Sequence, residues 1–113
     1  MVASGGGKVV LRGTRRRIAL ARATRTLRLL RRMGVSAKVV GSLVDGRFSD
    51  TSDVDFLVSF CPRSLKYAIE GRVEDLMGEI PFDVVYREET REKALRSMES
   101  HAADERELLR LAA

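Results

Sequence analysis

Apolar side chains recur every three or four positions through residues 14–33, which is the period of a helix that packs on one face. Most of the arginines in this segment fall elsewhere on the helical wheel. Gly34 follows directly, and glycine commonly ends a helix because it adopts a left-handed conformation without strain. The pattern therefore predicts a helix over this segment. Its core-facing stripe consists of Leu20, Ala23, Leu27 and Leu30.

Three short apolar segments, at residues 37–40, 54–60 and 82–86, predict β-strands. The segment at 54–60 reads Val-Asp-Phe-Leu-Val-Ser-Phe and gives the clearest strand signal of the three. A polar stretch at residues 45–52 separates the first two segments and is expected to be a loop, with a helical turn near Ser42 before it.

A second helix is predicted after Ser64, whose hydroxyl group can cap the first turn. Its apolar positions repeat every three or four residues, as in an amphipathic helix. These positions are Leu65, Ile69, Val73 and Leu76. From Glu88 onward the whole sequence favours helix. The candidate core contacts of this C-terminal part are Ala94, Leu95, Met98, Leu108, Leu109 and Leu111.

Helices alternate with strands along the chain, which indicates an α/β (α+β) fold with a small mixed sheet of about three strands flanked by helices. The length of 113 residues corresponds to one small domain, expected over residues 13–113. Residues 1–12 are expected to form a flexible tail, because the three glycines at positions 5–7 have high backbone entropy and no side chain to bury.

The composition is that of an ordinary globular chain, with 44% hydrophobic and 33% charged residues. No apolar run approaches the roughly 20 residues that cross a bilayer, and the first residues lack the apolar core of a signal peptide. We therefore expect a cytoplasmic protein without a membrane partner. Cys61 is the single cysteine and His101 the single histidine, so a zinc site lacks ligands, and a Cys–His catalytic pair is a weak alternative.

The net charge of +5 is concentrated near the N-terminus, where nine arginines and no acidic residue fall between Arg12 and Arg32. Such a run is compatible with nucleic acid, an acidic partner or phosphate ligands. A solvated helix face is favoured over these, because arginine stems cover apolar surface while the charged groups stay in water. The absence of an aromatic residue from this helix also argues against base stacking, so nucleic acid is the lesser alternative.

Two aspartates stand two residues apart at the start of the clearest strand, Asp53 and Asp55. Side chains at positions i and i+2 of a strand point to the same face, so both carboxylates are expected to converge. Asp83 lies in another apolar strand and supplies a third carboxylate. Close carboxylates repel unless a cation lies between them, and hard oxygen ligands suit Mg²⁺ or Mn²⁺. The three acids are therefore predicted to form a catalytic metal site.

Each of these acids also has a structural reading. Asp53 and Asp55 could belong to a plain turn at the entry of a strand, where Ser and Asp are common. Asp83 could be a buried acid paired with an arginine. A glycine and a serine after the first strand, Gly41 and Ser42, favour the metal site, because glycine lets the backbone approach a ligand and a hydroxyl group suits phosphate oxygens.

A Gly-Ser pair, ten further residues and then Asp-x-Asp resemble the signature of the DNA polymerase β-like nucleotidyltransferase superfamily. The short chain and the strand-borne third acid make it similar to the minimal nucleotidyltransferase (MNT) branch. The resemblance implies a nucleotidyltransferase-like fold and a transferase that uses ATP with Mg²⁺ or Mn²⁺. It also implies a nucleotide-binding or metal-binding role for the residues matching the signature. These are Gly41, Ser42, Asp53, Asp55 and Asp83, to which we add Gly46, Arg47 and Ser52 as nucleotide-contacting residues.

Many members of that branch are antitoxins that transfer AMP to a HEPN-domain ribonuclease toxin. The resemblance therefore implies a HEPN-type protein partner, with a homo-oligomer left open. This chain has Val44-Asp45-Gly46 where the family usually has Ala-Arg-Gly. Either Arg47 replaces the missing positive charge, or phosphate binding is weakened. In the second case the chain would be a catalytically weak binding module that neutralises its partner by forming a complex.

Overall fold

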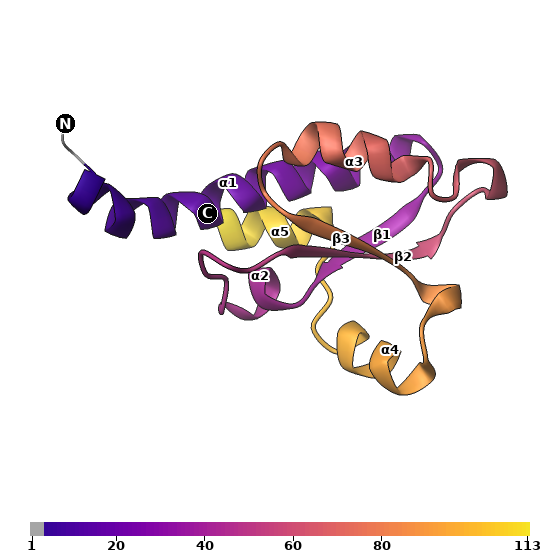
Figure 1. The fold of residues 1–113 in the computed structure, drawn as a ribbon. Helices are drawn as coiled ribbons and strands as arrows, with labels where there is room; N and C mark the ends of the chain where they lie inside the picture. Colours follow the sequence, from indigo (N-terminus) through magenta and orange to yellow (C-terminus); the bar gives the residue numbers. More distant parts are fainter. Residues whose placement is uncertain (1–3) are drawn as a thin grey trace.

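The computed structural model describes the backbone of residues 4–113 and the side chains of residues 13–113. Within that part, five α-helices and three strands alternate along the chain (Figure 1). They are α1 (Ser4–Arg32), β1 (Ser36–Val40), α2 (Ser42–Asp45), β2 (Val54–Phe60), α3 (Ile69–Met77), β3 (Phe82–Tyr86), α4 (Glu92–Glu99) and α5 (Glu105–Ala112). Short 3₁₀ turns at Arg63–Leu65 and Arg87–Glu89 complete the list. None of the described helices is both long and apolar enough to cross a membrane.

The three strands form one mixed sheet in the order β1-β2-β3. β1 runs antiparallel to β2, and β3 runs parallel to β2. The strands at 54–60 and 82–86 begin and end where the sequence predicted, and β1 starts one residue earlier, at Ser36. The predicted fold class, a small mixed sheet of three strands flanked by helices, is confirmed.

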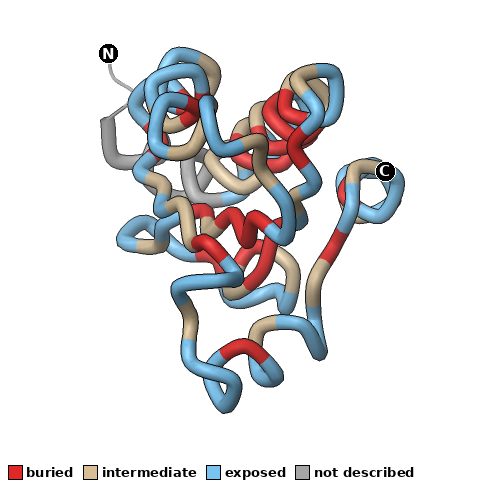
Figure 2. Tube along the Cα trace, turned by 90° about the vertical axis from the view of Figure 1, so that its right-hand side faces the viewer, coloured by how far each residue is buried: buried red, intermediate tan, exposed pale blue. Residues whose placement is uncertain are grey.

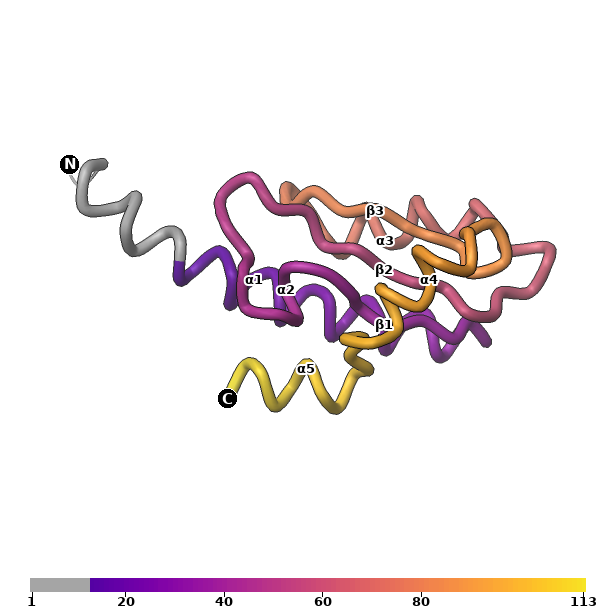
Figure 3. Tube along the Cα trace, turned by 90° about the horizontal axis from the view of Figure 1, so that it is seen from below, coloured from indigo at the N-terminus to yellow at the C-terminus, as the bar shows by residue number. Residues whose placement is uncertain are grey.

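The alternation of side chains along β2 divides the sheet into two unlike faces. Val54, Phe56 and Val58 are buried in the main hydrophobic core, under the layer formed by α1, α3 and α5. Asp55 and Leu57 point the other way, where Leu57 packs in a second, smaller core with a residue of α4. In Figure 1 α1 and α3 lie above the sheet and α4 lies below it, and Figure 3 shows α4 crossing the strands from the β3 side towards β1.

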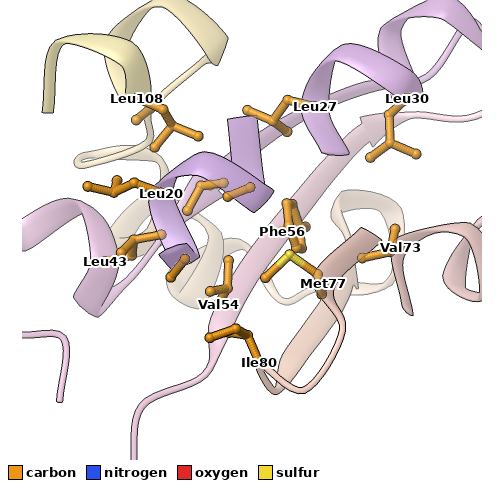
Figure 4. Packing of buried hydrophobic residues seen from close by; sticks show 14 of the residues in the cluster. Leu20, Leu27, Leu30, Leu43, Val54, Phe56, Val73, Met77, Ile80 and Leu108 are labelled. Atoms are coloured by element: carbon orange, nitrogen blue, oxygen red, sulfur yellow. The ribbon is translucent and has the colours of Figure 1, made fainter. Parts of the chain in front are cut away.

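The stripe predicted on the first helix is the centre of the main core. All four of its residues are at most 4% exposed, and several are seen against β2 and α3 in Figure 4. They are Leu20, Ala23, Leu27 and Leu30. Figure 2 shows how buried stretches gather between this helix layer and the sheet. The helix begins at Ser4, earlier than the predicted start at Thr14. Residues 1–3 lie outside the described part, and the flexible tail expected over residues 1–12 stays a prediction.

The second long helix begins later than predicted. Ser64 lies in a 3₁₀ turn, and α3 starts only at Ile69. The cause is Tyr67, whose φ of 69° is left-handed and cannot continue a right-handed helix. Of the predicted core positions, Ile69 and Val73 are buried, and Met77 completes the buried face.

The C-terminal helical region is broken at a point that the residue pattern does not predict. Between α4 and α5 the chain forms an antiparallel bridge with β1, in which the amide and carbonyl groups of Ala103 bond to those of Val39 at 2.8 and 2.9 Å. Asp104 then starts α5 with a capping box, accepting a hydrogen bond from the Glu107 amide. Leu95 and Leu108 are buried as predicted. Ala94 and Leu109 are exposed, so their assignment to the core was wrong.

Candidate functional site

Two of the predicted acids lie side by side on the lower face of the sheet. Asp55 is the second residue of β2 and Asp83 the second residue of β3, and the parallel register pairs them directly. Residues paired in register point to the same face, so both carboxylates face the side on which α4 lies. The antiparallel register places Val40, the last residue of β1, on the other side of Asp55. The carboxylate pair therefore stands at one end of the sheet, where β1 ends and β2 and β3 begin.

Asp55 is held in a setting that disfavours its charge. Partial burial raises the pKa of this carboxyl group, and the negative charges of Asp83 and then Asp53 raise it further, to about 6. A cation would relieve the repulsion among these carboxylates. The electrostatics of the site therefore favour the binding of a cation.

Gly41 closes the site on the β1 side. It has φ 85° and ψ −151°, a conformation that is essentially restricted to glycine. A Cβ atom at this position would lie 2.7 Å from Oδ2 of Asp55, well inside contact distance. Glycine is thus needed twice at position 41, once for the backbone and once to leave room for the carboxylate.

The carboxylate pair opens into a pocket of about 550 Å³ between the sheet and α4. This volume lies within the roughly 300–1,000 Å³ of pockets that hold small molecules. The sheet side is lined by Val40, Gly41, Asp45, Arg47, Asp55, Asp83 and Val85. The α4 side is lined by Ser97, Met98, Ser100 and His101. None of these four was assigned to the site from the sequence, which placed His101 in an exposed helical stretch. The only signal was that it is the single histidine of the chain.

Asp53 is less closely associated with the pocket than the sequence suggested. It precedes the first residue of β2, is exposed, and does not line the pocket, although its charge is felt by Asp55. Among the described residues no three His, Cys, Asp or Glu side chains converge as a metal-binding group. The structure therefore brings together two of the three predicted acids and leaves the third outside the pocket lining.

The residues present fit Mg²⁺ or Mn²⁺ as a two-carboxylate site. Mg²⁺ is commonly bound through one or two carboxylates, several waters and the phosphates of a substrate, without a cage made only of protein. Asp55 and Asp83 supply oxygen ligands of this kind, and their mutual repulsion favours a cation. Asp83 is exposed and forms no ion pair among the described residues, which removes the alternative of a buried arginine partner.

Asp45 and Arg47, at the mouth of the pocket, are bound to each other. Nη2 of Arg47 lies 2.8 Å from Oδ2 of Asp45, and Nε donates to Oδ1 at 3.2 Å. The hydrogen bond from Arg47 is also the main reason why the pKa of Asp45 is lowered. The guanidinium that could replace the missing family arginine is thus paired with the aspartate at the substituted position.

The remaining predicted residues shape the loop and do not line the pocket. Ser42 opens the short helix α2, and Gly46 ends it with a left-handed φ of 84°. The hydroxyl oxygen of Ser52 accepts a hydrogen bond from the Ser49 amide at 2.9 Å and so tightens the turn before Asp53. Arg15 of α1 donates a hydrogen bond to the Ser52 carbonyl oxygen at 3.4 Å. This contact with the loop was not predicted from the sequence.

Other candidate groups lie away from this pocket. Cys61 lines a separate cavity at the opposite end of β2, so it does not pair with His101. The arginine helix is partly neutralised by neighbouring elements. Arg22 binds Glu79 at 2.7 Å, and Arg28 and Arg31 both bind Glu105 of α5. These ion pairs support a structural role for part of the arginine face.

Comparison with known proteins identifies both a family and a similar solved structure. Residues 20–109 match the family model of the nucleotidyltransferase domain. A solved structure described as a candidate minimal nucleotidyltransferase superposes with a TM-score of 0.61 and 28% sequence identity, covering 73% of this chain and 87% of that chain. None of the curated proteins compared with the chain matches it in sequence. The stretch matched by the family model contains all three strands, Gly41, the three aspartates and α4.

Proposed function

The chain belongs to the nucleotidyltransferase domain family, in its minimal branch, and on that premise we propose that it transfers AMP from ATP to a hydroxyl group of a partner protein. Membership of the family makes it a nucleotidyl-transferring enzyme. The nucleotide, the acceptor, the metal and the partner are the proposal.

In the proposed reaction the acceptor oxygen forms a bond to the α-phosphorus of ATP. The bond between the α-phosphorus and its bridging oxygen breaks, and pyrophosphate leaves with the electron pair. The hydroxyl proton passes to the carboxylate of Asp83, which is exposed and can release it to water. The products are the AMP ester of the acceptor and pyrophosphate, which balance the reactants.

Asp55 and Asp83 would hold a divalent cation, with Asp53 as a more distant contributor of negative charge. When bound, Mg²⁺ or Mn²⁺ supplies positive charge to the phosphate oxygens and makes an attacking hydroxyl more acidic. The protein orients the two carboxylates through strand pairing and keeps space beside Asp55 free of side-chain atoms through Gly41.

One observation carries the proposal more than any other. The register of β2 and β3 sets Asp55 directly beside Asp83 at the floor of a pocket, with Gly41 against the first carboxylate. A mere turn at the start of a strand would account for Asp53 and Asp55 but would not require this pairing across strands or the close approach of a glycine.

The acceptor is proposed to be a protein because the described part of the chain contains little beyond the single sheet and its helices. A HEPN-type toxin is the partner suggested by the minimal branch that the chain resembles. A large acceptor can supply the outer wall of a site that is open towards solvent at Asp45 and Arg47, both of which are exposed.

A second function is favoured by the ion pair between Asp45 and Arg47. If this pair persists when nucleotide is present, the phosphates receive no help from the guanidinium, and catalysis is weak. The chain would then neutralise its partner by forming a complex. The two functions differ in whether the carboxylates are needed.

The test uses the chain with its genomic neighbour as partner, provided that a HEPN-type reading frame lies beside it. Asp55→Asn combined with Asp83→Asn should fold, because neither side chain is fully buried. The double variant should lose transfer of labelled AMP by a thousandfold or more, the order expected when several kcal/mol of transition-state stabilisation are removed. Arg96→Gln, an exposed change on α4 outside the pocket lining, is the matched control.

Transfer at the wild-type rate by the double variant would contradict the assignment of the carboxylates. If the wild type labels nothing but silences its partner, and the double variant does so equally well, the binding function is the correct one.

A further inference from the structure

The lower face of the sheet is covered by α4 only in part, and the end of this helix lines one side of the pocket. Its last turn and the residues after it, Ser97, Met98, Ser100 and His101, stand opposite the strand residues that carry the carboxylates. The pocket is thus longer than the metal site. One end holds Asp55 and Asp83, and the other end is bounded by α4.

The wall is anchored at both ends. Leu95 of α4 is buried against Val40 and Leu57 in the smaller core. After α4 the chain is fixed to β1 by the two hydrogen bonds between Ala103 and Val39. An ion pair of 3.1 Å between Arg87 and Glu99 ties the end of α4 to the segment that follows β3. Residues 97–101 therefore belong to a held segment between two attachment points.

The chemistry of this wall differs from that of the carboxylate end. Met98 and Val85 are half-buried, and both pack against the smaller core, so they give an apolar surface inside the pocket. Ser97, Ser100 and His101 are exposed and supply hydroxyl and imidazole groups at its edge. The Ser100 hydroxyl oxygen lies 3.0 Å from Nδ1 of His101, which orients the ring and leaves its other nitrogen unused by that contact.

We propose that the α4 wall binds the nucleoside part of the nucleotide, with the base against Met98 and Val85 and polar groups of the nucleoside at Ser97, Ser100 and His101. This inference rests on the proposed function, in which the phosphates lie at the carboxylates. A nucleoside triphosphate has a charged end and a flat, largely apolar end with polar edges. The pocket has the same sequence of chemistries from Asp55 to Met98, and ligand pockets commonly combine an apolar surface with a few fixed polar groups.

The experiment compares two ligands that share the phosphates and differ in the nucleoside. Binding of ATP and of inorganic tripolyphosphate, each with Mg²⁺, is measured by calorimetry for the wild type and the variants. Met98→Ala removes the apolar contact and should weaken ATP binding by about tenfold. His101→Ala should weaken it by about three- to tenfold through the loss of one polar contact. Both should leave tripolyphosphate binding within about twofold of wild type.

Met98 also contacts the smaller core, so Met98→Ala could weaken ATP binding by destabilising the fold. A third variant avoids this ambiguity because it leaves the core unchanged. Ser97→Trp adds bulk to the pocket from an exposed helix position and should reduce ATP binding by at least tenfold without changing tripolyphosphate binding. Arg96→Trp is the matched control, because Arg96 is the exposed neighbour that does not line the pocket. The melting temperature of each variant without ligand verifies that it is folded.

The outcomes are distinct. If the wild type binds neither ligand, the proposed function fails. If both ligands bind but the α4 variants weaken them equally, or weaken neither, the nucleoside assignment is overturned while the carboxylate site stands. If Ser97→Trp leaves ATP binding intact and lowers only the transfer of AMP, the wall serves the acceptor, which also overturns the assignment.

Discussion

Replacing Gly41 with alanine should damage the site in a way that the same change at Gly46 does not. Both glycines have a positive φ, 85° at Gly41 and 84° at Gly46. The two differ in their surroundings. A Cβ at position 41 would lie 2.7 Å from Oδ2 of Asp55, whereas a Cβ at position 46 would have no heavy atom within 4 Å.

The backbone cost of each change follows from its conformation. Gly46 is in the left-handed helical region, where a side chain costs about 1–2 kcal/mol. Gly41 is in a region that is almost exclusive to glycine, where strain is about 1–3 kcal/mol. At about 4–8 °C per kcal/mol for a small domain, Gly46→Ala should lower the melting temperature by about 4–16 °C and Gly41→Ala by at least as much.

The ligand response separates the two variants. In Gly41→Ala the new methyl group must push the Asp55 carboxylate away from its place beside Asp83. This variant should lose most of the stabilisation that Mg²⁺ and ATP give to the wild type, whereas Gly46→Ala should keep it. Thermal denaturation with and without Mg²⁺ and ATP, repeated by calorimetry at 20 °C where both variants are folded, measures the difference. Equal ligand stabilisation of the two variants would refute the argument that Gly41 shapes the carboxylate site.

Three further substitutions test the pKa of Asp55, the ion pair between Asp45 and Arg47, and the packing of α5 in the main core. In buffer with a metal chelator, Asp55→Asn should be increasingly more stable than wild type as the pH rises from about 4 to 6.5. In the folded wild type the pKa of Asp55 is raised to about 6, whereas in the unfolded chain it is about 3.9. Between these values the folded state holds a proton that the unfolded state has released, so the stability of the wild type falls as the pH rises. A difference in melting temperature between variant and wild type that does not change with pH would show that Asp55 is not destabilised by its setting. Asp45→Ala should tighten Mg·ATP binding by about three- to tenfold in calorimetry, because in the wild type Arg47 is paired with Asp45 at 2.8 Å and the variant frees its guanidinium for phosphate. Weaker binding by the variant would contradict this expectation. Leu108→Ala should reduce the free energy of unfolding by about 2–5 kcal/mol in urea titration, because Leu108 of α5 is completely buried in the main core. A loss below about 1 kcal/mol would mean that α5 is only loosely attached.

The strands and their acids could be predicted from the sequence because the information is local. The apolar segments at 54–60 and 82–86 lie between polar or proline-containing stretches, and the position of each aspartate within its strand follows from the segment alone. That Asp55 and Asp83 are direct neighbours depends on the register between β2 and β3, which strand periodicity cannot give. The convergence of Asp53 was expected from the i, i+2 rule, but this residue precedes the strand to which the rule applies.

The α4 wall could not be predicted because tertiary contacts create it. Residues 88–113 favour helix throughout, and the break that separates α4 from α5 comes from the bridge between Ala103 and Val39, which are distant in sequence. The bridge lies two residues after His101, which lines the pocket, and so fixes this segment to the sheet beside the carboxylates. The late start of α3 has a similar origin, since the left-handed Tyr67 donates its amide hydrogen to the hydroxyl oxygen of Tyr86 on β3.

The most direct test of the central claim is the position of the label that is transferred. The chain and its partner are incubated with Mg²⁺ and ATP that carries radioactive phosphorus in either the α- or the γ-phosphate, and the incorporated label is counted. Nucleotidyl transfer predicts labelling from α-labelled ATP only, with release of pyrophosphate and loss of the signal in the Asp55→Asn, Asp83→Asn variant. Labelling from γ-labelled ATP, or α-labelling that persists in the double variant, would contradict the account.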